Sequence, residues 1–174
     1  MNTQEIQEQL NEIERIKKVR ELSDRVKDVK IAMLTTNDTK GEPHSRPMYT
    51  FPIKDDGVIW FLTQKDSIKS EEITTTRTVN INYTDHPNNL YVSVTGEASL
   101  SADKEKIDEL WTEMFKAWFA DGKNDPNIAL LKVVPHKVEY WDAPDSIMSQ
   151  ILLVVKAGLA GNPYQVGEHK KIDL

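Results

Sequence analysis

The stretch EPHSRPMYTFPI, residues 42–53, reads as a β-strand with an unusual step inside it. Tyr49, Phe51 and Ile53 alternate with smaller or polar neighbours, which is the two-residue period of a strand. Pro47 cannot donate a hydrogen bond to an adjacent strand, and it directly follows Arg46, one of only five arginines in the chain. A proline here indicates either an ordinary edge strand or a position where something other than a strand is the neighbour.

The segments on either side of this stretch predict an antiparallel sheet. Short turn sequences, DTKG (38–41) and KDDG (54–57), separate the first runs of β-type residues, so we expect the first three strands to form two successive hairpins. Gly96 suggests a bulge in its strand, and Pro135 suggests an interruption. The predicted strands are residues 30–37, 43–53, 58–63, 79–85, 90–100 and 128–142.

Helices are predicted at the start of the chain, between strands and near its end. Residues 3–29 carry apolar side chains at steps of three or four, a stripe that packs on the core or on a partner chain. Residues 101–119 repeat this pattern with Asp103 as the N-cap, and a short helix follows the third strand. We expect one more helical piece over residues 146–160, followed by a polar tail that orders only on docking.

These elements predict an α+β fold that is mainly β. About six antiparallel strands would curl into a small barrel, with helices covering its open ends. A length of 174 residues suits one domain with a normal core. We therefore expect residues 1–142 to form the barrel domain with its N-terminal helix, and residues 143–174 to extend the same domain.

The composition excludes several classes of function. The chain has no cysteine, so disulfides, thiolate nucleophiles, cysteine-type zinc sites and Fe–S clusters are ruled out. A net charge of −6 opposes binding to nucleic acid or to an anionic membrane. The N-terminus lacks the apolar core of a secretory signal, and the longest apolar run, residues 151–155, is too short to span a bilayer. We therefore expect a cytoplasmic protein.

Cations and hydroxyl groups near strand ends are the strongest candidates for a binding site. None of the four histidines pairs at helical metal-ligand spacing, and the adjacent Glu71 and Glu72 read as a solvated helix face. A helix N-terminus beside a guanidinium suits a phosphate, although exposed cations are common and an ordinary solvated surface stays open. The candidates are Arg46, Thr63, Ser67 and Lys69.

Five segments carry a recognisable pattern in a fixed order and spacing. They are SRPMYTF (45–51), VIWFLTQKDSIKSEEI (58–73), VNINYTD (79–85), LYVSVTGEASLSADKEKIDELW (90–111) and FKAWFADGKNDPNIALLKVVPHKVEYWD (115–142). The most specific piece is W-F-x-x-G-x-x-D-P at 118–126. In this order, over about residues 22–142, the chain resembles the general stress protein family of pyridoxamine-phosphate-oxidase-like flavoproteins.

That resemblance implies a split β-barrel that binds FMN, with a role for each candidate residue. The backbone of Arg46, Pro47 and Met48 would border the isoalloxazine ring, where a proline loses nothing because a ligand replaces the adjacent strand. The side chains of Arg46 and Lys69 would bind the FMN phosphate. Further hydroxyl or backbone donors would come from Thr63 and Ser67.

The resemblance also implies a homodimer with the flavin at the subunit boundary. Trp118 and Phe119 would then reach the partner's flavin, unless both pack in the core beneath their own helix. The expected partners are therefore a second copy and a small-molecule redox partner, with no nucleic acid and no membrane.

One departure from the pattern bears on the reaction. True pyridoxamine-phosphate oxidases bind their substrate's phosphate with C-terminal arginines, whereas this chain has none after Arg77 and lysine does not replace an arginine fork. Vitamin B6 oxidation is therefore not expected. Because FMN does not itself name a reaction, two functions stay open. One is an NAD(P)H-linked oxidoreductase with an unidentified acceptor, and the other is non-catalytic binding or buffering of FMN. Another ligand in the same cleft, such as a deazaflavin or haem, is a third possibility.

Overall fold

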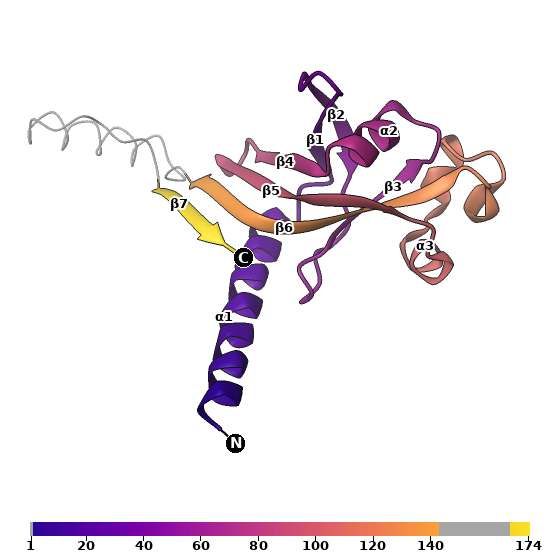
Figure 1. Ribbon diagram of the computed structural model, residues 1–174. Helices are drawn as coiled ribbons and strands as arrows, with labels where there is room; N and C mark the ends of the chain where they lie inside the picture. The colour runs from indigo at the N-terminus through magenta and orange to yellow at the C-terminus, as the bar shows by residue number, and fades with distance from the viewer. Residues whose placement is uncertain (1, 143–167) are drawn as a thin grey trace, which may run out of the picture.

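The computed structural model describes residues 2–142 and 168–174 and has the expected α+β fold, in which an antiparallel sheet dominates (Figure 1). The pairing order is β2-β1-β4-β5-β6-β3, with β7 added on β6, so the described strands number seven rather than about six. The strands are β1 (Ile31–Asn37), β2 (Pro43–Tyr49), β3 (Ile59–Gln64), β4 (Thr78–Asp85), β5 (Leu90–Ser101), β6 (Ile128–Asp142) and β7 (Glu168–Asp173).

The sheet is open between β2 and β3, which lie at the two ends of the pairing order. The first expected hairpin, β1 with β2, is confirmed, but the second is wrong because β3 pairs with β6. After β2 the backbone N–H of Thr50 donates to the carbonyl of Lys30, and the Thr50 hydroxyl donates to that of Val29. These bonds hold the chain against the start of β1 instead of letting it turn back on β2. Pro47 therefore lies on an edge strand, where a sheet tolerates proline.

The long strands β5 and β6 bend together at one bulge. The register shifts between Thr95 and Gly96, which confirms the bulge expected at this glycine. The interruption expected at Pro135 is wrong, because β6 runs continuously through it and pairs it with Gly96. A Cβ atom on Gly96 would lie 2.6 Å from the backbone oxygen of Val134, so only glycine fits where the two strands approach so closely.

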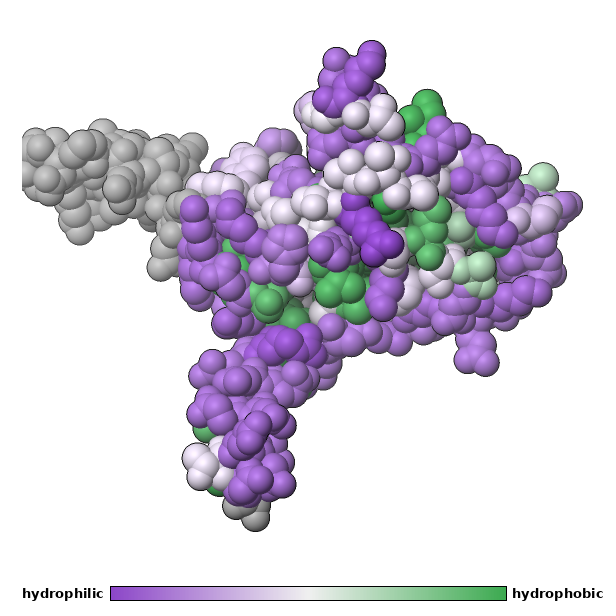
Figure 2. Space-filling view, in the orientation of Figure 1, coloured by the Kyte–Doolittle hydropathy of each residue, from purple (hydrophilic) through white to green (hydrophobic). Residues whose placement is uncertain are grey.

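The N-terminal helix α1 (Thr3–Val26) begins with a capping box formed by Asn2 and Glu5. Its C-terminal half packs Val19, Leu22 and Val26 into the core, whereas its N-terminal half is exposed. Figures 1 and 2 show that exposed half as a mostly hydrophilic projection from the body of the molecule.

The other helices are short. Helix α2 (Ile68–Thr75) follows β3, and α3 (Lys104–Leu110) begins with Asp103 as its N-cap, as expected. The single helix predicted over residues 101–119 is wrong beyond Leu110. Trp111 has extended backbone angles (φ −66°, ψ 133°), and two 3-10 turns follow, η1 (Glu113–Ala117) and η2 (Gly122–Asn124). The break lets Phe115 pack against the aromatic residues of the β2 end, so tertiary packing overrides the helical period.

Two apolar clusters hold the fold together. The larger lies between the sheet and α1, and the smaller joins β3, β6, α3 and η1 around Leu62, Phe115 and Phe119. The tail, predicted as polar and ordered only on docking, contributes β7, whose Ile172 reaches the larger cluster. The helix predicted over residues 146–160 lies outside the described residues. Among the helices that are described, none combines the length and apolar character needed to cross a membrane.

Candidate functional site

A cleft of about 400 Å³ lies where the sheet is open. Strand β2 forms one wall and β3 the other, while η1 and the residues after it close one end. All of the predicted site residues except Ser67 line this cleft. The cleft is polarised: its cationic end holds Arg46 and Lys69, and the rest of its lining is mainly apolar and aromatic.

Arg46 and Lys69 come from different elements and face the same space. The Arg46 side chain, 22% exposed, donates through Nη2 to Glu72 Oε2 at 3.0 Å and through Nη1 to the Thr36 hydroxyl. The ammonium group of Lys69, a half-buried residue in the first turn of α2, has no hydrogen bond or ion pair with any described residue. Burial lowers the pKa of its ammonium group, and the neighbouring charge of Arg46 lowers it further. A half-buried cation left in this state favours an anionic ligand.

Glu72 lies beneath the cationic end with 6% of its surface exposed. It accepts hydrogen bonds from Thr36 and Arg46 on one oxygen, and its other oxygen lies 2.6 Å from His44 Nδ1. Burial alone would raise the pKa of this carboxyl, but the three hydrogen bonds and the charge of Arg46 outweigh it and lower the pKa. The prediction that Glu72 belongs to a solvated helix face is therefore wrong.

The two hydroxyl groups predicted at the site, those of Thr63 and Ser67, differ in whether they have a hydrogen-bond partner. Thr63 is 4% exposed, lines the cleft, and its Oγ1 has no hydrogen-bond partner among the described residues. Ser67 is the N-cap of α2, but its hydroxyl lies 2.9 Å from the Gln64 carbonyl oxygen and 2.8 Å from Ser70 Oγ, so it remains in the turn. Ser67 borders an adjoining open hollow that also includes Arg46 and Lys69. A buried hydroxyl without a partner is costly unless a ligand uses it.

The aromatic residues predicted to contact flavin divide between core and surface. Phe119 is 3% exposed and belongs to the smaller apolar cluster, although its edge also lines the cleft. Trp118 is 60% exposed at the mouth of the cleft. Its backbone oxygen accepts from Gln64 Nε2 at 3.2 Å, and its backbone N–H donates to the Phe115 carbonyl at 3.0 Å. Packing thus accounts for Phe119. The Trp118 ring lies 6.2 Å from the Phe115 ring, but most of its surface remains exposed to a ligand or a second chain.

Sequence reasoning missed the apolar side chains that complete the cleft wall. They are Ile31, Tyr49, Leu62, Met114 and Phe115. Each follows the period of its strand or helix and so carries no signal that separates it from ordinary core. Glu72 was missed for a different reason: its burial depends on Thr36, His44 and Arg46 reaching it from two other strands.

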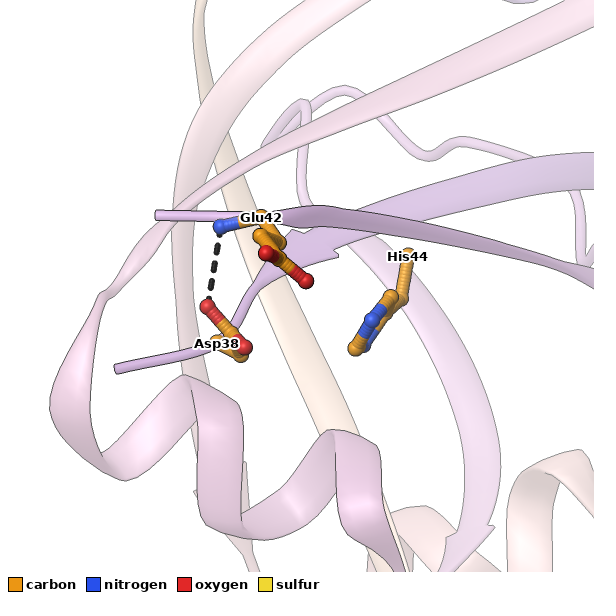
Figure 3. A group of neighbouring side chains, drawn as sticks. All are labelled: Asp38, Glu42 and His44. Carbon is orange, nitrogen blue, oxygen red and sulfur yellow. Dashed lines mark hydrogen bonds between the residues drawn. The ribbon is translucent and has the colours of Figure 1, made fainter. Parts of the chain in front are cut away.

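A second polar group, Asp38, Glu42 and His44, gathers near the turn between β1 and β2 (Figure 3). Asp38 Oδ1 accepts hydrogen bonds from the backbone N–H groups of Lys40 and Glu42, both at 2.8 Å. His44 Nδ1 is already bound to Glu72. The group is mostly exposed, and these bonds explain it as the structure of a turn rather than as a metal site.

The chemistry of the cleft selects a particular kind of ligand. Two cations, a buried hydroxyl without a partner and the free N–H groups at the start of α2 suit a phosphate. The adjoining apolar wall suits a flat ring system. Among the described residues that line the cleft, Tyr49 is the other titratable side chain besides Arg46 and Lys69.

Comparison with known proteins shows which family has this sequence pattern. Residues 17–165 match the family model described as pyridoxamine 5'-phosphate oxidase like. General stress protein 26 of Bacillus subtilis is 36% identical over 107 residues, which are 60% of this chain and 74% of that protein.

Two crystal structures extend the comparison. A candidate general stress protein 26 from Jannaschia sp. CCS1 has a TM-score of 0.69 at 28% identity, covering 89% of this chain and 97% of that one. The general stress FMN/FAD binding protein from Xanthomonas citri has a TM-score of 0.64 at 29% identity, covering 73% and 89%. The family model matches most of the chain, including the strands of the open antiparallel sheet up to β6. This match shows that the chain belongs to the pyridoxamine 5'-phosphate oxidase like family.

Proposed function

We propose that this protein binds FMN in the cleft between β2 and β3. The observation that carries the proposal is the half-buried Lys69 ammonium, which faces Arg46 and has no partner among the described residues. The FMN phosphate would lie between these two cations, with Thr63 Oγ1 as a further partner. The ring would lie against the apolar wall and the backbone of Pro47 and Met48.

The chain's own residues would hold and shield the cofactor. Bound FMN supplies the electron-transfer chemistry, while the protein sets access to it and its surroundings. The apolar wall would exclude water from one side of the ring, and the cations would fix its tail. We further propose that the protein is an NAD(P)H-linked oxidoreductase, because the cleft opens to solvent at Trp118 and leaves room for a donor to approach.

Equilibrium binding tests the cofactor assignment. The purified protein mixed with FMN should show flavin absorption near ~370 and ~450 nm and quench FMN fluorescence. FMN should bind at least about 10-fold more tightly than riboflavin, because a hydrogen bond to a charged group contributes about 1.5–3 kcal/mol. Equal affinity for the two flavins would remove the phosphate assignment. Preferential binding of a deazaflavin or haem would replace FMN as the ligand.

Anaerobic mixing tests the reaction. NADH or NADPH should bleach the flavin absorption near ~450 nm faster in the complex than in free FMN at the same concentration. A complex no faster than free FMN with either nucleotide would contradict the oxidoreductase proposal and favour a protein that binds or buffers FMN.

We also propose that the protein is a homodimer with the flavin at the subunit boundary. Large apolar side chains are exposed beside and on the cleft rim: Ile31 (53%), Met33 (40%), Met114 (46%) and Trp118 (60%). Ile31, Met114 and Trp118 also line the cleft, so a second copy that packs on part of this rim would place the ligand at the subunit boundary and leave the rest of the opening to a donor.

A charge on β1 tests the dimer. Met33→Asp should raise the dimer dissociation constant at least about 30-fold, because burying an aspartate in an apolar interface costs about 2 kcal/mol or more. Val134→Asp on β6 is the matched control, since Val134 is also exposed (48%) but lies away from the cleft lining. Sedimentation velocity would measure both. A wild-type chain that is monomeric at micromolar concentration would contradict the proposal.

A further inference from the structure

Glu72 is the buried charge on which the cationic end of the cleft is built. It lies in α2 and bonds to Thr36 on β1 and to His44 and Arg46 on β2, so one carboxylate connects three elements. Both of its oxygens are occupied, and Thr36 is itself fully buried. Glu72 is not among the residues that line the cleft, so its carboxylate contacts Arg46 and would not contact a ligand.

We propose that Glu72 is the positioning residue for Arg46, an inference that rests on the proposed binding of a flavin phosphate. A guanidinium has five N–H donors, and Arg46 uses one on Thr36 and one on Glu72. The other three have no partner among the described residues, and Arg46 lines the cleft. A free arginine side chain has many rotamers, so fixing it before the ligand arrives removes an entropy loss from binding.

The negative charge of Glu72 would also repel a phosphate. Its effect through charge and its effect through positioning Arg46 therefore have opposite signs, and variants can separate them. The charge of Glu72 reduces the sum over Arg46, Lys69 and Glu72 from two positive charges to one. A glutamine can accept from Thr36 and Arg46 through its oxygen and donate to His44 through its amide nitrogen, so Glu72→Gln keeps the contacts and removes the charge. Glu72→Ala removes both.

The test compares FMN with riboflavin, which lacks the phosphate, in the full-length protein. For Glu72→Ala we expect FMN affinity to fall about 10-fold or more, with riboflavin affinity changed by less than about 2-fold. Glu72→Gln should keep at least about one third of the wild-type affinity for FMN, so the conservative variant should rescue binding. Glu71→Ala is the matched control. The Glu71 side chain is next in sequence to Glu72 but exposed, so the affinities for FMN and for riboflavin should both stay at the wild-type value.

Three results would overturn the inference: unchanged FMN affinity in Glu72→Ala, an equal loss for FMN and riboflavin, or a Gln variant as weak as the Ala variant. If Glu72→Ala does not fold, Glu72→Asp retains the charge but withdraws the carboxylate from Arg46, and it should weaken FMN alone. Failure of this pattern in Glu72→Asp would overturn the inference equally. If Arg46→Ala weakens FMN while the Glu72 variants do not, only the positioning role fails. A wild-type chain that does not prefer FMN to riboflavin overturns the proposed function itself.

Discussion

Alanine at Arg46 or at Lys69 should weaken FMN binding by about 1.5–3 kcal/mol, roughly 10- to 150-fold for each change. Both side chains line the same end of the cleft, and each would donate to the phosphate from a partly desolvated position. Isothermal titration of the two variants with FMN measures the effect. Lys65→Ala is the matched control, because Lys65 is exposed and its ammonium donates to the Pro126 carbonyl at 3.0 Å.

The same two substitutions should change the stability of the ligand-free protein in opposite directions. Burial and Arg46 lower the pKa of Lys69, so at neutral pH its charge opposes folding, and removing it should raise the unfolding midpoint. Removing Arg46 takes a partner from the buried Glu72 carboxylate and should lower the midpoint. Thermal unfolding without FMN separates these outcomes. Lower stability in both variants would mean that Lys69 has a structural role.

The pH dependence of binding follows from the same lysine. The protonated ammonium is the form that would hold the phosphate, so FMN affinity should fall as the pH rises through the lowered pKa of Lys69. Lys69→Ala should lose this dependence, while Arg46→Ala should keep it because Lys69 remains. Unchanged FMN affinity in both alanine variants would place the phosphate elsewhere.

Local signals in the sequence predicted much of this architecture. The presence of α1 and β1, the Asp103 cap and the bulge at Gly96 depend on a residue and its near neighbours, which sequence reports directly, although α1 ends at Val26 and not at residue 29. The phosphate candidates were found because Arg46 and Lys69 sit at a strand and at a helix start. The two residues meet in one cleft only because the sheet is open, and the open sheet was predicted from the family resemblance and not from local patterns.

The features that sequence reasoning missed all depend on distant partners. Strand β3 pairs with β6 because the chain after β2 is held to β1 by Thr50, a contact no turn motif reveals. The second amphipathic helix ends at Trp111 because Phe115 packs against the β2 end. Glu72 is buried only because three donors reach it from two strands, so its own neighbourhood in the sequence resembles a solvated helix face.

The largest effect on folding is expected from Gly96→Ala. The added Cβ would lie 2.6 Å from the Val134 backbone oxygen, 2.9 Å from Val133 Cγ1 and 3.1 Å from Pro135 Cα. Two of these atoms are backbone in the centre of paired strands and cannot rotate away, so the strands must separate locally. Overpacking of this kind costs about 2–3 kcal/mol, and the urea midpoint should fall accordingly without a change in the m-value.

Gly41→Ala provides the comparison that identifies the cause. Gly41 has φ +84° and nothing within 4 Å of an added Cβ, so its substitution tests backbone strain without a clash and should cost about 1 kcal/mol. Gly96 has no such backbone requirement, so its larger loss would come from space alone. Because β6 also carries β3 and hence Thr63, a bulge forced apart at Gly96 should weaken FMN binding as well. Equal stability losses in the two variants would contradict the close approach of β5 and β6 on which the open barrel depends.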